Sequence, residues 1–498
     1  MHEIITLQLG NLSNYTATHF WNAQESYFTY GDQDQSPVNH DIHWRSGVGH
    51  DGSETFLPRT VIYDLKGGFG SLRKINPLYD ATLTSDAAAD FLWSGRPTVH
   101  KQDAVSPSAY QQGLDAGENS PPRPTPSSVR YWSDFSRVYF HPRSLVQLYD
   151  FELNSTIRPF ERFAMGTELF SSLDREHDIV DRDWRPFAEE CDLMQGIQVF
   201  TTLDDAWGGF ASSYLEALRD EYPKSCIWVW GLQSPVVRDV PREKRQLRLV
   251  NAAQTLSQAC SQASMVVPLS LPDGPFPSSV ALDPGSPWQV SGLLSAAAES
   301  AGLQSRLAAR RPTLLSELAE SLNTTGTQTL AAASMDVGQP ADELNREKLD
   351  VDLFHLGRFG RNDRHREKPG RVFGQVSSYR GTAKLDESEE NESKDHRLSR
   401  PIVGNPVVRR YTSTLKFPLL DSYPQIYRDI PEGETTAAVR TVLSTTTAMT
   451  ARMRNLRSQV SRSLMLEERE TLSNGLAEIA DAYQDDWSSG SDEDDDDV

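Results

Sequence analysis

The sequence is poor in cysteine and contains no long apolar run. Its three cysteines, Cys191, Cys226 and Cys260, are spread over 498 residues, and this spacing excludes a disulfide framework and a cysteine-based zinc cluster. No stretch approaches the roughly 18 consecutive apolar residues of a membrane-spanning helix. The first residues include Glu3 but no arginine, unlike a signal or transit peptide. We therefore expect a cytosolic chain without a transmembrane segment.

Basic side chains are fewer than acidic ones, with 49 Lys and Arg against 70 Asp and Glu, which gives a formal net charge of −21. Part of this excess lies in the acidic run at residues 492–497. Such a balance disfavours wholesale binding to nucleic acid or to anionic lipid. We expect protein partners and no direct contact with nucleic acid.

The first 22 residues predict a strand, a sharp turn and a helix. Residues 3–9 have the apolar and β-branched content of a strand. Gly10 and Asn11 tolerate the backbone angles of a tight turn, and residues 14–21 continue as a helix. A strand that delivers the chain to a helix N-terminus is the elementary phosphate-facing unit of α/β folds.

Further strands and helices alternate along the first half of the chain. We predict strands at residues 56–65, 196–201 and 226–231, and helices at 160–194, from 210 to about 222, and at 251–261. This alternation predicts an α/β fold with a Rossmann-like, mostly parallel sheet. A Pro- and Ser-rich stretch at 102–129 is typical of an exposed linker or a long loop.

The second half of the chain has a different composition. We expect a helical connection at 288–335, strands at 400–430, helices at 435–484, and a disordered insert at 358–395, because basic and acidic residues crowd there. We divide the whole chain into two parts of a nucleotide-domain fold (1–115 and 116–287), the connection (288–335), a second α+β domain (336–430), C-terminal helices (431–484) and an acidic disordered tail (485–498).

Several short segments, in co-linear order, resemble tubulin. They are Glu3-Ile4, Gln8, Gly10, Asn14 and Phe20-Trp21, followed by residues 57–65, 191–196, 199–200, 220–223 and 251–252. Within the tubulin superfamily the chain is identified as a member of the Misato family, whose fungal members are the distribution and morphology of mitochondria proteins. The segments that favour this family are residues 7–11, 19–21, 64–67, 141–144 and 204–205.

This resemblance implies a tubulin/FtsZ-like fold and a role in the partitioning of mitochondria and mitochondrial DNA, and in mitochondrial distribution and morphology; the altered loop described below makes us expect that this role is non-enzymatic. It also implies a location in the cytoplasm and, peripherally, at mitochondria. The partners would be tubulin or the cytoskeleton, chaperonin, or proteins of the outer mitochondrial surface. Two alternatives stay open, a polymerising GTPase that binds GTP and a chaperone-like cofactor for tubulin or other cytosolic clients.

The segment that corresponds to tubulin's glycine-rich phosphate loop is altered. Asp204 and Asp205 replace two glycines and Trp207 replaces the threonine. A carboxylate about 4 Å from a phosphate oxygen is repelled by several kcal/mol. Lys66 stands where tubulin has an acidic residue, and no Gly-x-x-Asn-x-Asp motif occurs in the sequence. We therefore expect no GTPase activity, no catalytic residue and no bound cofactor.

If a nucleotide is bound nevertheless, its contacts would come from six residues. They are Gln8, Gly10, Asn14, Asp64, Gly208 and Gly209. For the first four we favour a structural role in turns and at the start of a helix. The last two suit either close packing or a residual phosphate nest. His40, His43 and His50 lie in a polar stretch for which we expect no metal.

Overall fold

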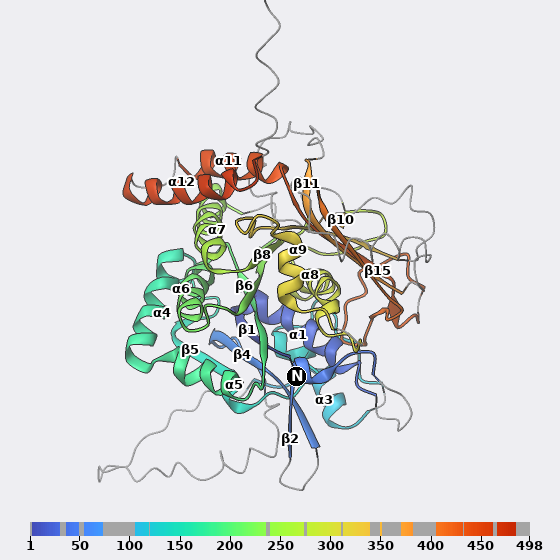
Figure 1. The fold of residues 1–498 in the computed structure, drawn as a ribbon. Coiled ribbons are helices and arrows are strands. Elements are labelled where there is room, and N and C mark those ends of the chain that lie inside the picture. The colour runs from blue at the N-terminus through green and yellow to red at the C-terminus, as the bar shows by residue number, and fades with distance from the viewer. Residues whose placement is uncertain are drawn as a thin grey trace, which may run out of the picture.

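The computed structural model describes most of the chain in thirteen stretches. They are residues 2–29, 36–48, 54–72, 105–118, 120–235, 240–272, 276–309, 312–338, 349–350, 370–381, 405–431, 433–461 and 466–484. Two large sheets, with helices between and around them, form most of the described structure (Figure 1), and two short two-stranded sheets accompany them.

The first sheet is parallel and has the strand order β5-β4-β1-β6-β7-β8. Its strands are β1 (Glu3–Leu9), β4 (Thr60–Lys66), β5 (Leu145–Glu152), β6 (Met194–Thr202), β7 (Cys226–Leu232) and β8 (Met265–Leu269). Strands β1, β6 and β7 carry long buried apolar runs, as expected for strands that are covered on both faces. The predicted Rossmann-like parallel sheet is confirmed.

Helices cover both faces of this sheet (Figure 1). On one face lie α4 (Phe163–His177), α6 (Ala206–Glu221) and α7 (Arg242–Gln262), and on the other α1 (Asn11–Glu25), α8 (Pro287–Ala301) and α9 (Leu315–Leu322). Alternate residues of each strand point to opposite faces. For this reason Ile5 and Leu7 pack with α6, whereas Trp228 and Trp230 pack in the core around α8.

The second sheet has the order β10-β9-β15-β11-β12. Its strands are β9 (Ala332–Val337), β10 (Leu349–Asp350), β11 (Val372–Arg380), β12 (Val407–Ser413) and β15 (Val439–Thr446). Val376 and Leu443 join the core around α8, so this helix lies between the two sheets and is buried on all sides. Helices α11 (Ala448–Val460) and α12 (Leu466–Asp481) pack across α7 (Figure 1).

Shorter elements complete the fold. Strands β2 (Trp44–Val48) and β3 (Glu54–Pro58) form one antiparallel pair, and β13 (Phe417–Pro418) and β14 (Thr436–Ala437) form another. Helices α3 (Ala109–Asp115) and α5 (Arg185–Glu189) are short. Single 3₁₀ turns lie at His40–Ile42, Trp132–Phe135, Pro142–Ser144 and Leu303–Ser305, and a π-helical turn lies at Val180–Trp184.

The prediction of a disordered insert at 358–395 is wrong for β11. This strand pairs with β15 on one side and with β12 on the other, and its last residue, Arg380, is fully buried. The charged residues that flank the strand dominate the local composition and hide it. Residues 358–369 and 382–395 lie outside the described residues.

Three other segments also differ from the predictions. Residues 102–129 include α3, whose Gln111 is buried and donates to the carbonyl oxygens of Ser133 and Ser136 at 2.9 and 2.7 Å. The prediction is therefore wrong for α3, whereas most of residues 115–118 and 120–129 are exposed and irregular, as a long loop would be. The predicted helical region at 435–484 begins with β14 and β15, and residues 439–446 alternate between buried and half-buried positions, as a strand requires. The strand predicted at 56–65 is divided at Arg59 between β3 and β4.

A buried ion network joins the second sheet to α8. Glu299 accepts hydrogen bonds from Arg306 Nη2 at 2.8 Å and from the Tyr27 hydroxyl at 2.9 Å, and it pairs with Arg380 through its other oxygen. Arg380 Nη2 also donates to the Tyr27 hydroxyl at 2.8 Å. Each charge is compensated inside the protein, as burial of ionic groups requires.

Within the stretches listed above, no helix is both long and apolar enough to span a lipid bilayer.

Candidate functional site

The crevice at the carboxyl ends of β1 and β6 is the place where this type of sheet binds ligands. The chain leaves β1 toward β4 on one side and leaves β6 toward β7 on the other, so the direction of winding reverses between them. Ligands of open α/β sheets bind at such a switch point. Here α1 begins after Gly10 and α6 begins after Asp205, and their N-termini come from neighbouring strands.

Asp64 lies at the end of β4 and is completely buried. Its Oδ2 accepts hydrogen bonds from Asn14 Nδ2 at 2.9 Å and from Trp132 Nε1 at 3.0 Å, and its Oδ1 accepts one from the Leu65 amide at 2.9 Å. Burial raises the pKa of Asp64 to about 6, although these hydrogen bonds oppose the rise. The carboxylate holds β4, α1 and the 3₁₀ turn that contains Trp132 together.

Gln8 and Asn14 also serve the scaffold. Gln8 Nε2 donates to Thr60 Oγ1 at 2.9 Å and so links β1 to β4. Asn14 Nδ2 donates to the carbonyl oxygen of Tyr63 at 3.1 Å as well as to Asp64. Both side chains are almost fully buried. The structural interpretation that the sequence favoured accounts for the contacts of both residues.

The indole of Trp207 covers Gly10. Gly10 has φ +94°, and a Cβ placed on it would lie 2.6 Å from Cδ1 of Trp207. The rings of Phe160 and Phe210 hold the indole edge-to-face, with centroids 5.4 and 5.5 Å away. Trp207 is only 4% exposed. At the start of α1, an aromatic ring therefore occupies the space beside the glycine backbone.

Asp205 caps α6. Its side chain accepts a hydrogen bond from the backbone amide of Trp207 at 2.9 Å and one from Thr202 Oγ1 at 2.5 Å. The neighbouring Asp204 accepts hydrogen bonds from the Ser234 amide and hydroxyl. Burial, and then the charge of Asp204, raise the pKa of Asp205 to about 7, and burial raises the pKa of Asp204 as well. A backbone amide at the N-terminus of α6 thus finds its hydrogen-bond acceptor in a side chain of the protein itself.

Gly208 and Gly209 lie in the first turn of α6, not in a loop, because the helix begins at Ala206. A Cβ on Gly208 would lie 2.1 Å from Thr255 Oγ1 of α7, and a Cβ on Gly209 would lie 2.0 Å from the carbonyl oxygen of Phe163 in α4. Both glycines allow α6 to approach its neighbours closely. Of the two interpretations left open from the sequence, close packing describes their contacts.

Two further observations concern the predicted residues. Lys66 is half-buried at the end of β4. His43 is buried, and the ring of His40 stacks on Phe28 with centroids 3.7 Å apart, while His50 lies outside the described residues. Among the residues that the structure describes, no three His, Cys, Asp or Glu side chains group so that they could hold a metal ion.

Comparison with known proteins agrees with this architecture. The profile of the Misato Segment II tubulin-like domain matches residues 2–116, and that of a tubulin domain matches residues 121–307. The chain is 58% identical to Protein DML1 of Gibberella zeae and 49% identical to Protein dml-1 of Neurospora crassa, in both cases over the whole of both chains. The chain belongs to the Misato/DML1 family.

A more distant fungal relative covers part of the chain. Protein dml1 of Schizosaccharomyces pombe is 34% identical over 54% of this chain and 60% of its own length. The Misato/DML1 assignment and the tubulin-like fold that the sequence predicted are therefore confirmed. The chain is a member of a family of mitochondrial distribution and inheritance.

The sequence of this Misato/DML1 chain shows that Trp207 replaces a threonine, but it does not show the partners of the indole. Trp132, which donates to Asp64, and Phe160, which packs on Trp207, belong to segments distant in the sequence. Trp132 closely follows the Pro- and Ser-rich stretch at 102–129. A signal was available there, because Trp132 and Phe135 are large apolar residues with the spacing of one helical turn.

Proposed function

We propose that this Misato/DML1 protein takes part in the partitioning of mitochondria and their DNA as a non-enzymatic interaction factor, without binding or hydrolysing GTP. It would act in the cytoplasm and at the mitochondrial periphery through protein partners. Family membership supports the mitochondrial role. The arrangement at the carboxyl ends of β1 and β6 supports the absence of a nucleotide.

The contact between Trp207 and Gly10 carries this proposal. A phosphate bound at a helix N-terminus approaches the backbone N–H groups closely, and glycine is used there because it has no Cβ. Here the indole lies within van der Waals distance of the Gly10 backbone, where such a phosphate would approach. The residues present therefore do not fit a triphosphate unless the Trp207 side chain leaves the core that Phe160 and Phe210 form around it.

The charges beside α6 support the same conclusion. Asp205 already accepts the Trp207 amide hydrogen that a phosphate oxygen would otherwise use. Asp204 adds a second buried carboxyl group next to it, and Arg248 Nε lies 3.9 Å from its Oδ2. An incoming phosphate would face carboxyl groups instead of a row of amide donors, and this arrangement is unfavourable.

Nucleotide content tests the proposal directly. The purified protein is denatured, and the released nucleotides are separated by ion-exchange chromatography, with tubulin as the positive control. We expect less than about one tenth of an equivalent of guanine nucleotide, and no saturation when a fluorescent GTP analogue is titrated to about 1 mM, which corresponds to a binding free energy weaker than about −4 kcal/mol. Stoichiometric GTP or a micromolar dissociation constant would overturn the proposal.

The cellular role needs a separate experiment. A fungal strain that lacks its own DML1 protein is complemented with this chain, and mitochondrial networks are imaged in dividing cells. We expect restored mitochondrial inheritance, and we expect the same from a Lys66→Gln variant, since no phosphate has to be bound. GTP-dependent sedimentation of the pure protein would favour the polymerising GTPase instead. Co-purification with chaperonin and tubulin alone, without mitochondrial proteins, would favour the chaperone-like cofactor.

A further inference from the structure

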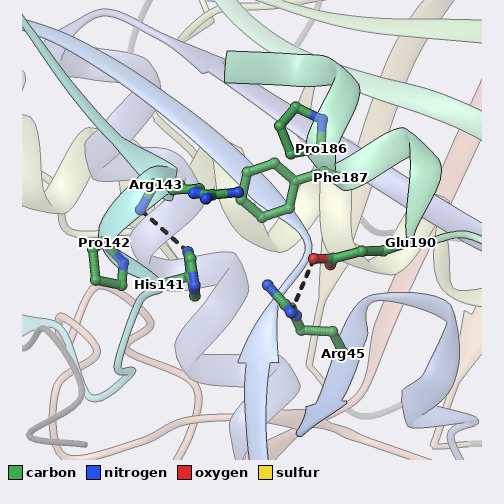
Figure 2. A pocket seen from close by; sticks show the side chains of 7 residues that line it. All are labelled: Arg45, His141, Pro142, Arg143, Pro186, Phe187 and Glu190. Atoms are coloured by element: carbon green, nitrogen blue, oxygen red, sulfur yellow. Dashed lines mark hydrogen bonds and ion pairs between the residues drawn. The ribbon is translucent and has the colours of Figure 1, made fainter. Parts of the chain in front are cut away.

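A cavity of about 430 Å³ lies at the opposite edge of the first sheet, near the amino ends of its strands. Figure 2 shows the side chains that line it. They come from β2 (Arg45), from the turn before β5 (His141, Pro142 and Arg143) and from α5 and the residue after it (Pro186, Phe187 and Glu190). Arg143 comes just before β5, whereas Gly10 follows the end of β1. Leu145 lies opposite Ile62 of β4, and Ile62 lies opposite Gln8 of β1, so the cavity is two strands across from β1, and Arg143 comes about four residues, roughly 13 Å, before the level of Gly10.

The charged side chains that line this cavity are Arg45, Arg143 and Glu190. Arg45 Nη2 pairs with Glu190 Oε1 at 2.9 Å on one wall (Figure 2). Burial, followed by the charges of Arg45 and Arg143, lowers the pKa of His141 to about 4, so this imidazole is neutral at physiological pH. Its Nδ1 accepts a hydrogen bond from the Arg143 amide at 3.2 Å. The His141 ring is therefore fixed in place, and because it is uncharged it does not compete with Arg143 for an anion.

A second cavity, of about 620 Å³, adjoins the first and shares Arg143 with it. It is lined by Leu145, Val146, Gln147 and Tyr149 of β5 and by Arg182 and Asp183 of the π-helical turn. Arg182 is paired with Asp183 at 2.7 Å. Three arginines line the two cavities, and Arg45 and Arg182 each pair with a carboxylate. Within the described part of the chain, the guanidinium of the third, Arg143, pairs with none.

Strand β5 forms one wall of this second cavity. It is the outermost strand of the first sheet, and among the described strands it pairs with β4 alone. Three consecutive residues, 145–147, line the cavity, whereas a strand seen face-on would present every second residue. Tyr149 is 75% exposed at the end of this wall. Such an edge offers main-chain donors and acceptors to an added strand.

We propose that the two cavities around Arg143 bind an extended acidic segment of a partner protein. The guanidinium of Arg143 takes a carboxylate of the segment, because a guanidinium matches the planar geometry of a carboxylate with paired hydrogen bonds. The outer edge of β5 pairs with its main chain. Pro142, Pro186 and Phe187 give the first cavity rigid apolar walls for the methylene groups next to that carboxylate.

The surroundings favour a polypeptide over a membrane or a nucleic acid. Glu190 and Asp183 lie in the walls of the cavities, and the chain as a whole carries a net charge of −21. A wide anionic surface would be repelled by this arrangement, whereas one narrow strand can place a carboxylate on Arg143 and still avoid the acidic walls. This inference does not depend on the proposed absence of GTP, because neither cavity is lined by Gly10, Asp205 or Trp207.

The probe is a fluorescein-labelled decapeptide of alternating Glu and Thr, which favours an extended conformation and carries its acids on one face. Fluorescence polarisation with the full-length protein is expected to show saturable binding that weakens with added salt. The Arg143→Gln variant should bind about tenfold more weakly or worse. Arg143 is exposed, so this variant should retain the thermal midpoint of the wild type.

Matched controls decide the result. Arg123→Gln removes one exposed positive charge outside both cavities and should leave the affinity unchanged, and a Gln-Thr peptide should not bind. Equal binding to the Arg143→Gln and Arg123→Gln variants would overturn the proposal. It would also be overturned if the peptide failed to bind while vesicles with phosphatidylserine sedimented with the wild type and not with Arg143→Gln, since a lipid headgroup would then be the ligand.

Discussion

The indole of Trp207 lies on the backbone of Gly10, so close that a Cβ at Gly10 would lie 2.6 Å from Cδ1 of the ring. This contact joins the first turn of α6 to the residue before α1. The protein's own side chain thus occupies the space beside Gly10 at the carboxyl end of β1. In the Misato/DML1 protein, the tubulin-like switch point is therefore a packed junction.

The first prediction concerns that junction. Gly10→Ala should lower the free energy of unfolding by about 2 to 4 kcal/mol, because it adds a clash with Trp207 and strain at φ +94°. Urea unfolding followed by circular dichroism measures the loss. Gly117→Ala is the matched control, since Gly117 also has positive φ but nothing within 4 Å of a Cβ, and it should cost only about 1 kcal/mol. Equal losses of unfolding free energy in the two variants would contradict a close contact between Gly10 and Trp207.

The second prediction separates the two glycines of α6. Gly209→Ala should lower the free energy of unfolding by about 3 kcal/mol or more, because the backbone of α4 at Phe163 cannot move away easily. Gly208→Ala should lower the free energy of unfolding less, because the added Cβ meets the hydroxyl of Thr255, and this side chain can rotate away. In addition, alanine favours the helix over glycine by about 1 kcal/mol. Denaturant midpoints of both variants provide the measurement.

A double variant tests the reason given for Gly208. In a background with Thr255→Ala, the contact at 2.1 Å is gone, and adding Gly208→Ala should be neutral or slightly stabilising. If Gly208→Ala were equally harmful with and without the Thr255 hydroxyl, the two residues would not interact, and close packing against α7 would not explain this glycine.

The third prediction concerns the network of Glu299, Arg306 and Arg380. Glu299→Gln should lower the free energy of unfolding by about 3 to 5 kcal/mol, because it leaves two buried guanidinium groups without a counter-charge. Glu161→Gln breaks an ion pair with Lys244 that is partly exposed and should cost less than about 1 kcal/mol. Thermal or chemical unfolding of both variants at neutral pH would show the difference. A loss below 1 kcal/mol for Glu299→Gln would contradict the network.

The fourth prediction concerns pH and Asp205. Because the pKa of Asp205 is raised in the folded protein to about 7, the folded state holds a proton that the unfolded state releases above about pH 4. The stability contributed by this proton is complete below pH 4 and is lost as the pH rises through 7. Asp205→Asn keeps a capping oxygen but does not titrate. Its stability relative to the wild type should increase by about 1 to 3 kcal/mol between pH 5 and pH 8.

Glu299 should show the opposite dependence, and this provides the control for Asp205. Burial alone would raise the pKa of Glu299, but the charges of Arg380 and Arg306 outweigh burial and leave this pKa below its usual value. The stability that ionised Glu299 contributes is therefore present above the pKa that this group has in the unfolded chain, and it is lost as the pH falls through the lower pKa of the folded state. Unfolding curves at pH 4, 5, 7 and 8 distinguish the two residues. A constant difference between Asp205→Asn and the wild type would refute the assignment.

The sequence by itself determined the family, the parallel sheet and the strands β1, β4, β6 and β7, but it did not reveal β5 or β8. The strands there are continuous apolar runs, and the helices between them follow at regular intervals, so local pattern and tertiary structure agree. The alteration of the phosphate loop was also visible, because it consists of residue types. Local patterns were less informative in the second half, where β11 and β15 lie within stretches whose overall composition is that of a charged insert and of helices.

Only the tertiary structure decided what the altered residues do. Trp207 could have pointed into solvent or into the core, and its place on Gly10 depends on Phe160 and Phe210. The roles of Gly208 and Gly209 depend on how closely α7 and α4 approach. Arg380 is buried only because Glu299 and Tyr27 meet it from α8 and from beyond α1. These outcomes result from contacts between residues far apart in the chain, which no local pattern contains.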